Sequence, residues 1–359
     1  MSAISILDSR IRKLGRWNIQ GDGIWSGWGG SQLKFKVSGT NSLIVNANVT
    51  RPAGTVCYCE CVIDNSPENS ILKSFVNGQV VFDIPDTNEH SIVIKTNGYR
   101  ADIFNQVSKS VLLSLEIDNA GAILAQEHAP LLLQCVGDSW MAADNDWPRL
   151  MRSDMFDTYQ VATGGMTCAN ANTDYIYNAN GILADDPQSD AVIFSFGVND
   201  FNAGISVASF QSSLSSLIAK IQAFQSCPIF LVQVPRNVNT GKNFDQYGAA
   251  MQAASGGDVY YIPTGDLNYS VTWQADTYHL APQGKVLLAD YVGEFIVNAM
   301  NIRKDFLRIK GMSFEGENVI TNKHQLRYKG SFEFGSTLKP IASDSALRVM
   351  VNGNKYTIG

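Results

Sequence analysis

The sequence predicts an α/β domain with a doubly wound parallel sheet, preceded by a β-sandwich and followed by a small β-rich region. Three observations support this. Apolar and polar residues alternate up to about residue 128, apolar runs alternate with helical spacing from Pro130 onward, and a strand-like pattern returns after about Arg303. We therefore expect three parts, over residues 1–128, 129–302 and 303–359.

The first part has the pattern of half-buried antiparallel strands. Apolar residues alternate with polar neighbours over residues 33–37, 43–49 and 111–117. Asn77-Gly78 lies between two such runs and is typical of a tight hairpin turn. Short strands separated by Gly, Asn and Pro favour a sandwich or jelly roll.

Three tryptophans, Trp17, Trp25 and Trp28, lie among glycines near the start of this part. An aromatic ring can stack on a sugar or fill an apolar core. The cluster could thus form a sugar-binding surface or close one end of the sandwich, and we favour the second role.

The middle part is predicted to hold a sheet that helices bury on both faces, because its strand-like runs are continuously apolar. The spacing of apolar residues predicts a helix over 207–224 and a second from Pro282 to Met300. The apolar side of the second helix is expected to carry Val286, Leu287, Tyr291 and Phe295. The predicted strands cover residues 131–136, 158–161, 191–196, 229–234 and 259–262.

Composition narrows the classes of function. The chain has 27 Lys and Arg against 33 Asp and Glu, a formal net charge of −6, which argues against a nucleic-acid partner. No apolar stretch is long enough to span a bilayer, so we expect no membrane partner. The charged N-terminus lacks the apolar core of a secretory signal peptide. The C-terminal part is basic, which we interpret as a solvated small domain.

The six cysteines are not expected to form a disulfide framework. Cys57, Cys59 and Cys61 alternate along one strand-like run, where neighbours on one face are poorly placed to pair. We interpret the cysteines as mostly buried free thiols. A zinc cluster at this C-x-C-x-C run would need a second group of ligands nearby, so we expect no metal site.

Four short blocks lie at the ends of predicted elements in the middle part. The first three follow strands, and the fourth precedes the last long helix. Ligands of open α/β sheets bind at the carboxyl ends of the strands, where these blocks would meet. The blocks are Gly137-Asp138-Ser139, Gly164-Gly165, Gly197-Val198-Asn199-Asp200 and Asp276-Thr277-Tyr278-His279.

The blocks supply the parts of a nucleophilic serine site. A serine hydroxyl becomes reactive when an imidazole takes its proton, and a carboxylate can fix the tautomer of that imidazole. Ser139 offers the hydroxyl, and Asp276 and His279 offer the other two groups from one loop. Each block alone is more often structural, and their combination in this order favours an enzyme.

The chain resembles the SGNH (GDSL-like) hydrolase family, because the four blocks appear in the family's order across roughly half of the chain. The strand-rich part ahead of them, which opens near Gly15-Arg16-Trp17, is similar to the jelly-roll domain of two-domain carbohydrate esterases. The resemblance implies a three-layer α/β/α fold for the middle part. Trp140 stands where the family often has Leu or a small residue, which should change the pocket wall more than the chemistry.

The resemblance implies acyl transfer to water without a metal or a cofactor. Ser139 would attack an ester carbonyl, with His279 as general base and then general acid, and Asp276 would orient His279. The N–H groups of Ser139 and Gly165 and the side-chain amide of Asn199 would form the oxyanion hole.

Several neighbouring residues have supporting or open roles. We expect Asp138 to support its loop by hydrogen bonding. Gly164 is the alternative to Gly165 as the oxyanion donor. Trp140, Trp273 and Tyr278 would line the substrate-binding site, either stacked on a sugar ring or as its wall.

We expect a carbohydrate O-acetyl esterase that acts on an acetylated polysaccharide. A lipase or thioesterase of the same family, and a non-catalytic carbohydrate-binding or structural protein, are the alternatives. The strand-rich tail and the missing signal peptide favour a homo-oligomeric phage tail protein that deacetylates a bacterial surface glycan. Export by a non-classical route and a cytoplasmic location are the other expectations.

Overall fold

The computed structural model of the chain describes all residues except 27, 29, 52, 55, 67–69, 97–108, 143–146, 154, 163, 173–188, 236–243, 265–266, 268–278, 301–313, 323–324, 333–346, 352–353 and 359. The chain divides into two compact units, Met1–Val292 and Gly293–Gly359. In the described residues, no helix is both long and apolar enough to cross a membrane.

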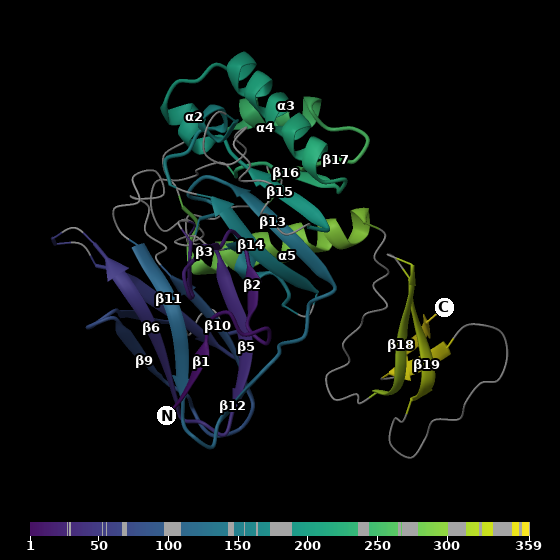
Figure 1. Cartoon of the computed structure of the whole chain (residues 1–359). Coiled ribbons are helices and arrows are strands. Elements are labelled where there is room, and N and C mark those ends of the chain that lie inside the picture. Colours follow the sequence, from purple (N-terminus) through teal and green to yellow (C-terminus); the bar gives the residue numbers. More distant parts are fainter. Residues whose placement is uncertain are drawn as a thin grey trace. The chain divides into compact units, whose positions relative to one another are not determined.

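The first unit begins with two antiparallel sheets (Figure 1). Their strands are β1 (Ser2–Ser5), β2 (Arg12–Leu14), β3 (Asn18–Gln20), β4 (Gly23–Trp25), β5 (Gln32–Ser38), β6 (Ser42–Thr50), β7 (Tyr58–Ile63), β8 (Ile71–Ser74), β9 (Gln79–Asp83), β10 (His90–Thr96), β11 (Lys109–Ile117) and β12 (Ala122–Leu124). One sheet has the order β3-β4-β11-β6-β9, with β1 beside β11. The other has the order β12-β5-β10-β7-β8, with β2 beside β5.

The two sheets share one apolar core and therefore form a β-sandwich. The alternating residues Leu33 and Phe35 of β5 and Leu43 and Val45 of β6 are fully buried in it, as the period-two pattern predicted. Cys57, Cys59 and Cys61 are buried in the same core as free thiols. The described residues hold no group of three or more side chains suited to a metal ion.

The turn predicted at Asn77-Gly78 joins β8 to β9. Asn77 has φ 51° and Gly78 has φ 79°, so both central residues adopt the left-handed region that a tight hairpin of this type requires. Val76 and Gln79 pair on either side of the turn. The prediction is confirmed, and the preference of Asn and Gly for this region explains it.

A five-stranded parallel sheet follows in the same unit, with the order β14-β13-β15-β16-β17. Its strands are β13 (Leu131–Gly137), β14 (Phe156–Ala162), β15 (Ala191–Ser195), β16 (Ile229–Val232) and β17 (Val259–Ile262). The helical segments are η2 (Trp147–Leu150), α1 (Cys168–Asn170), α2 (Val198–Asn202), α3 (Val207–Phe224), α4 (Asp245–Ala253) and α5 (Pro282–Ala299). This is the doubly wound α/β fold that the sequence predicted.

Helices cover both faces of the parallel sheet. Helices α3 and α4 lie over one face and α5 runs along the other (Figure 1). Phe210, Leu214 and Leu217 of α3 are fully buried in one cluster with Val192 and Phe194 of β15. The middle part thus has three layers, as expected.

The predicted apolar side of α5 was wrong at two of its four positions, since Tyr291 and Phe295 are partly buried but Val286 and Leu287 are not. Val286 and Leu287 are 46% and 43% exposed, whereas Leu288, Ala289 and Val292 are buried. The three buried positions share one helical face, and the other two point away from it. Apolar residues lie on both sides of this helix, so their spacing alone did not define the buried face.

The second unit contains two antiparallel hairpins, in agreement with the strand-like pattern after about Arg303. Strand β18 (Phe314–Asn322) pairs with β19 (Gln325–Phe332), and β20 (Leu347–Val351) pairs with β21 (Asn354–Ile358). The turn predicted at Asn352-Gly353 lies outside the described residues. Val351 and Asn354 are partners in the hairpin register on either side of it.

An imidazole between two carboxylates links two turns of the sandwich. His90 at the start of β10 contacts Asp64 through Nδ1 at 2.8 Å and Asp86 through Nε2 at 3.0 Å. The hydrogen bond to Asp64, reinforced by that to Asp86, raises the pKa of His90. Its stabilising contribution is therefore complete below the ordinary pKa of histidine and is lost as pH rises through the raised value.

We predict that His90→Gln destabilises the sandwich more at pH 5.5 than at pH 9, because the charged imidazole is present only at the lower pH. The melting temperature should fall by about 2 °C at pH 5.5 and by less at pH 9. Thermal unfolding of wild type and variant at both values measures the difference. His128→Gln, at an exposed position, is the control, and an equal or larger loss at pH 9 would contradict the prediction.

Candidate active site

Ser139 lies two residues beyond the carboxyl end of β13, which is an inner strand of the parallel sheet. The last residue of this strand, Gly137, is in register with Ala162 of β14 and Ser195 of β15. A Cβ atom on Gly137 would lie 2.5 Å from the Ser195 carbonyl oxygen and 2.7 Å from Met141 Cγ. Glycine is therefore needed for the tight turn that carries Ser139.

The structure brings Ser139 and His279 together. Nε2 of His279 lies 2.9 Å from the Ser139 hydroxyl oxygen, which is hydrogen-bond distance. His279 comes shortly before α5, and the following residue, Leu280, is buried and fixes this end of the loop. In the tautomer with an unprotonated Nε2, the Ser139 hydroxyl donates a hydrogen bond to the imidazole. This is the geometry that proton removal requires. Asp276, Trp273 and Tyr278 lie outside the described residues.

Two of the predicted oxyanion donors lie on segments that are joined to each other. Gly165 has φ 80°, and its position is exposed. Asn199, in the first turn of α2, donates from Nδ2 to the carbonyl oxygen of Met166 at 3.1 Å. The backbone and side chain of Asn199 also lie close enough to the Asp138 carboxyl group to act to lower its pKa. Asn199 thus connects the loop of Ser139 with the Gly164-Gly165 segment.

Two buried carboxyl groups accept hydrogen bonds from the backbone of the segments that follow Ser139 and Gly165. Asp138 accepts the backbone N–H of Trp140 at 2.9 Å, and Asp200 accepts the N–H of Cys168 with both oxygens, at 3.1 and 3.2 Å. Both aspartates are fully buried. Burial raises the pKa of Asp138 to about 7, and the nearby charge of Asp200 adds to the shift. Burial also raises the pKa of Asp200 to about 6.

The role of Asp200 was missed in the sequence. The residue is part of the Gly197–Asp200 block, but a carboxylate in the first turn of a helix is usually a surface feature. Its position directly after Asn199 was the available signal. The expected supporting role of Asp138 agrees with the hydrogen bond that it accepts from the Trp140 N–H.

The burial of Trp140 argues against the first of its two expected roles, stacking on a sugar ring, and the second role stays a prediction. Its side chain is 3% exposed, so it packs inside the domain and offers no open ring surface for a sugar. The residue follows Ser139 directly, and its N–H donates to Asp138. The tryptophans of the sandwich differ among themselves, since Trp28 is buried with the core of the parallel sheet and Trp17 packs on the core of the sandwich.

A serine hydroxyl and an imidazole in contact at the carboxyl edge of a doubly wound sheet define the site of a serine hydrolase. Residues 135–287 match the GDSL-like lipase/acylhydrolase family. The chain therefore contains an SGNH (GDSL-like) hydrolase domain and is a serine ester hydrolase. No curated protein matches the chain by sequence.

The structure is similar to those of three esterases. A carbohydrate esterase family 2 enzyme with a carbohydrate-binding domain, from Corynascus thermopiles (Myceliophthora fergusii), matches with a TM-score of 0.59 and 18% identity, over 81% of this chain and 99% of that chain. A family two carbohydrate esterase from Clostridium thermocellum in complex with cellohexaose matches with a TM-score of 0.60 and 16% identity, over 81% and 99%. The acetyl xylan esterase Est2A from the rumen bacterium Butyrivibrio proteoclasticus matches with a TM-score of 0.61 and 12% identity, over 84% and 100%. At these identities the likeness shows a shared fold.

We predict that Asp200→Asn gains stability relative to wild type as the pH rises from 4 to 7. The raised pKa of Asp200 means that folding favours its protonated form, so wild type loses this contribution as the pH passes about 6. Asparagine stays neutral and keeps one oxygen for the Cys168 N–H. Thermal unfolding across this range measures the difference, with Asp258→Asn at an exposed position as the control. A difference that stays flat or falls with pH would contradict the assignment.

Proposed function

We propose that this enzyme removes O-acetyl groups from a polysaccharide. The observation that carries the hydrolytic part is the 2.9 Å contact between Ser139 Oγ and His279 Nε2 at the carboxyl edge of the sheet. The carbohydrate and acetyl parts are supported by the fold, because two carbohydrate esterases and an acetyl xylan esterase match it over 81% to 84% of this chain.

In the proposed first step, Ser139 Oγ forms a bond to the acetyl carbonyl carbon while its proton passes to His279 Nε2. The carbonyl oxygen becomes an oxyanion, which the N–H groups of Ser139 and Gly165 and the amide of Asn199 stabilise. The bond to the sugar oxygen then breaks, and that oxygen takes the proton from His279. The sugar hydroxyl leaves, and the acetyl group stays on Ser139.

In the second step, His279 removes a proton from water as the water oxygen attacks the acetyl carbon. The same donors stabilise the second oxyanion. The bond to Ser139 Oγ breaks, the proton of His279 returns to it, and acetate leaves. Asp276 would orient His279 in both steps. The residues assigned to this chemistry need no metal ion.

A lipase is the second candidate, because the matched family model covers lipases and acylhydrolases of several kinds. A thioesterase belongs to the same alternative. These enzymes share the nucleophilic site, so the length of the acyl group that they accept separates them from a deacetylase.

We predict that hydrolysis of p-nitrophenyl esters is fastest for the two-carbon acyl group and slower for four and eight carbons. Ser139→Ala should remove about 10⁴-fold or more of the rate, since no other hydroxyl replaces the nucleophile. Ser212→Ala, at an exposed position of α3, is the matched control and should keep full activity. A preference for eight carbons would favour the lipase, and full activity in Ser139→Ala would exclude this site.

We also propose the setting that the sequence suggested, a homo-oligomeric phage tail enzyme that deacetylates a bacterial surface glycan. Only the strand-rich second unit, with its hairpins β18–β19 and β20–β21, supports an assembly role. We predict a light-scattering mass of at least twice the chain mass of 39.2 kDa. A monomer at micromolar concentration would contradict the oligomer. Location in a virion and export by a non-classical route stay predictions.

A further inference from the structure

The edge strand of the parallel sheet is covered by the sandwich. Strand β14 pairs with β13 on one side and ends the sheet on the other. An edge strand leaves backbone groups that need partners. The sandwich supplies two: the Gln160 N–H donates to the Gly30 carbonyl at 3.4 Å, and Gln32 Nε2 donates to the Thr158 carbonyl at 2.8 Å. Gly30 and Gln160 form an antiparallel bridge.

An ionic cluster holds the same strand near its amino end. Asp157 of β14 is ion-paired with Lys34 of β5 at 2.6 Å and with Arg12 of β2, and it accepts the Ala129 N–H at 2.9 Å. Although burial opposes the charge, these partners hold the pKa of Asp157 below its usual range. A buried pair of this kind is costly to break, because removal of one partner leaves an uncompensated charge.

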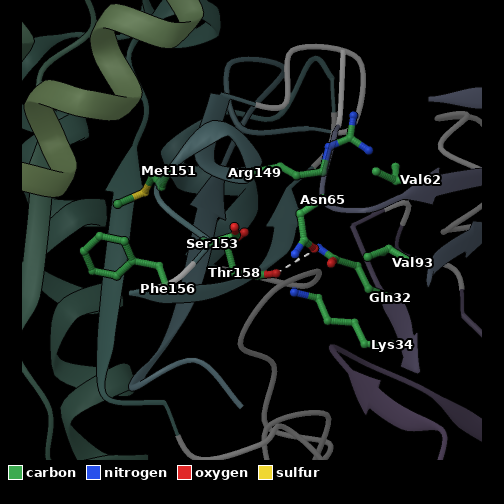
Figure 2. A pocket seen from close by; sticks show the side chains of 10 residues that line it. All are labelled: Gln32, Lys34, Val62, Asn65, Val93, Arg149, Met151, Ser153, Phe156 and Thr158. Carbon is green, nitrogen blue, oxygen red and sulfur yellow. Dashed lines mark hydrogen bonds between the residues drawn. The ribbon is translucent and has the colours of Figure 1, made fainter. Parts of the chain in front are cut away.

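Close packing completes the contact between the sandwich and β14. Figure 2 shows a small pocket between them, with Gln32 and Lys34 on one side and Ser153 and Thr158 on the other. Its volume is about 40 Å³, and residues of both parts line it. Trp28 of the sandwich is buried in the same apolar cluster as Tyr159 of β14.

Strand β14 leads toward Gly164-Gly165, which holds the expected backbone donor to the oxyanion. We call these residues the oxyanion segment. Ala162, its last residue, is in register with Gly137, two residues before Ser139. Gly165 follows three residues later. On its far side this segment is held by Asn199 through the Met166 carbonyl and by Asp200 through the Cys168 N–H. The oxyanion segment is thus held on its carboxyl side by Asn199 and Asp200 of α2. On its amino side it continues from β14, which the sandwich contacts.

We propose that the sandwich positions the oxyanion segment by fixing β14, and that Gly30 and Gln32 are positioning residues for the reaction. The inference rests on the proposed ester hydrolysis. Oxyanion donors act over a narrow range of distances, near 2.7–3.1 Å, so a small shift of Gly165 is costly. A displacement of about 1 Å can lower a rate by about 10²-fold. The sandwich is therefore part of the catalytic architecture.

The contact between the sandwich and β14 can be tested at Gly30, where substitution by alanine adds one methyl group. A Cβ atom there would lie 2.3 Å from Gln160 Cβ and 2.7 Å from the Gln160 carbonyl oxygen. Alanine would therefore have to push β14 and the sandwich apart. Gly23 of β4 offers a matched control, because its Cβ would lie 2.6 Å from the Leu112 carbonyl oxygen inside the sandwich.

The experiment compares Gly30→Ala, Gln32→Met and Gly23→Ala for hydrolysis of p-nitrophenyl acetate, well below the lowest melting temperature. We expect kcat to fall by about 10-fold or more in the first two variants, with KM within about two-fold. Gly23→Ala should lower the melting temperature and leave kcat near wild type. If all three variants lose only melting temperature and keep kcat, the sandwich has a structural role and the proposal is overturned.

Hydrogen exchange gives a second readout that needs no substrate. The Cys168 amide is held by Asp200, so its exchange should become faster in Gly30→Ala and stay unchanged in Gly23→Ala. Unchanged exchange in Gly30→Ala would also overturn the proposal. A wild-type enzyme that hydrolyses no ester would contradict the proposed function instead, and the exchange measurement would still test the positioning of the segment.

Discussion

The hydrogen bond between Ser139 and His279 joins two loops that are 140 residues apart in the sequence. It can form only if the carboxyl end of β13 and the loop before α5 reach the same edge of the sheet. The parallel order β14-β13-β15-β16-β17 provides this edge, since all its strands end on one side. Every other feature of the site is arranged around this contact.

The site contains two buried carboxyl groups, whereas an ordinary protein core excludes ionisable side chains. Asp138 directly follows β13 and Asp200 lies in the first turn of α2, and both are fully buried, where an ionised group is costly. Their hydrogen bonds from the N–H groups of Trp140 and Cys168 offset part of that cost. Such local conflicts concentrate at functional sites, where position matters more than stability. The two aspartates fix the loops, and Ser139 and His279 carry the chemistry.

Much of the fold and the site could be predicted because the signals are local. Continuous apolar runs identified four of the five parallel strands, and the fifth was predicted as a short strand over residues 158–161. The blocks after the strands contained Ser139 and Asn199. The α5 face was wrong at two of its four positions because apolar residues occur on both sides of that helix. The bridge between Gly30 and Gln160 has no local signature, since it depends on how two parts of the chain pack. Asp276 lies outside the described residues, so its expected role stays a prediction.

The most direct test of the account is whether His279 activates Ser139. An organophosphate ester that phosphorylates activated serines, followed by peptide mass spectrometry, measures this without the natural substrate. Wild type should carry one adduct, on Ser139, and His279→Ala should react at least about 10²-fold more slowly, because general-base assistance is lost. Equal labelling of both proteins, or an adduct on another serine, would contradict the central role of this contact.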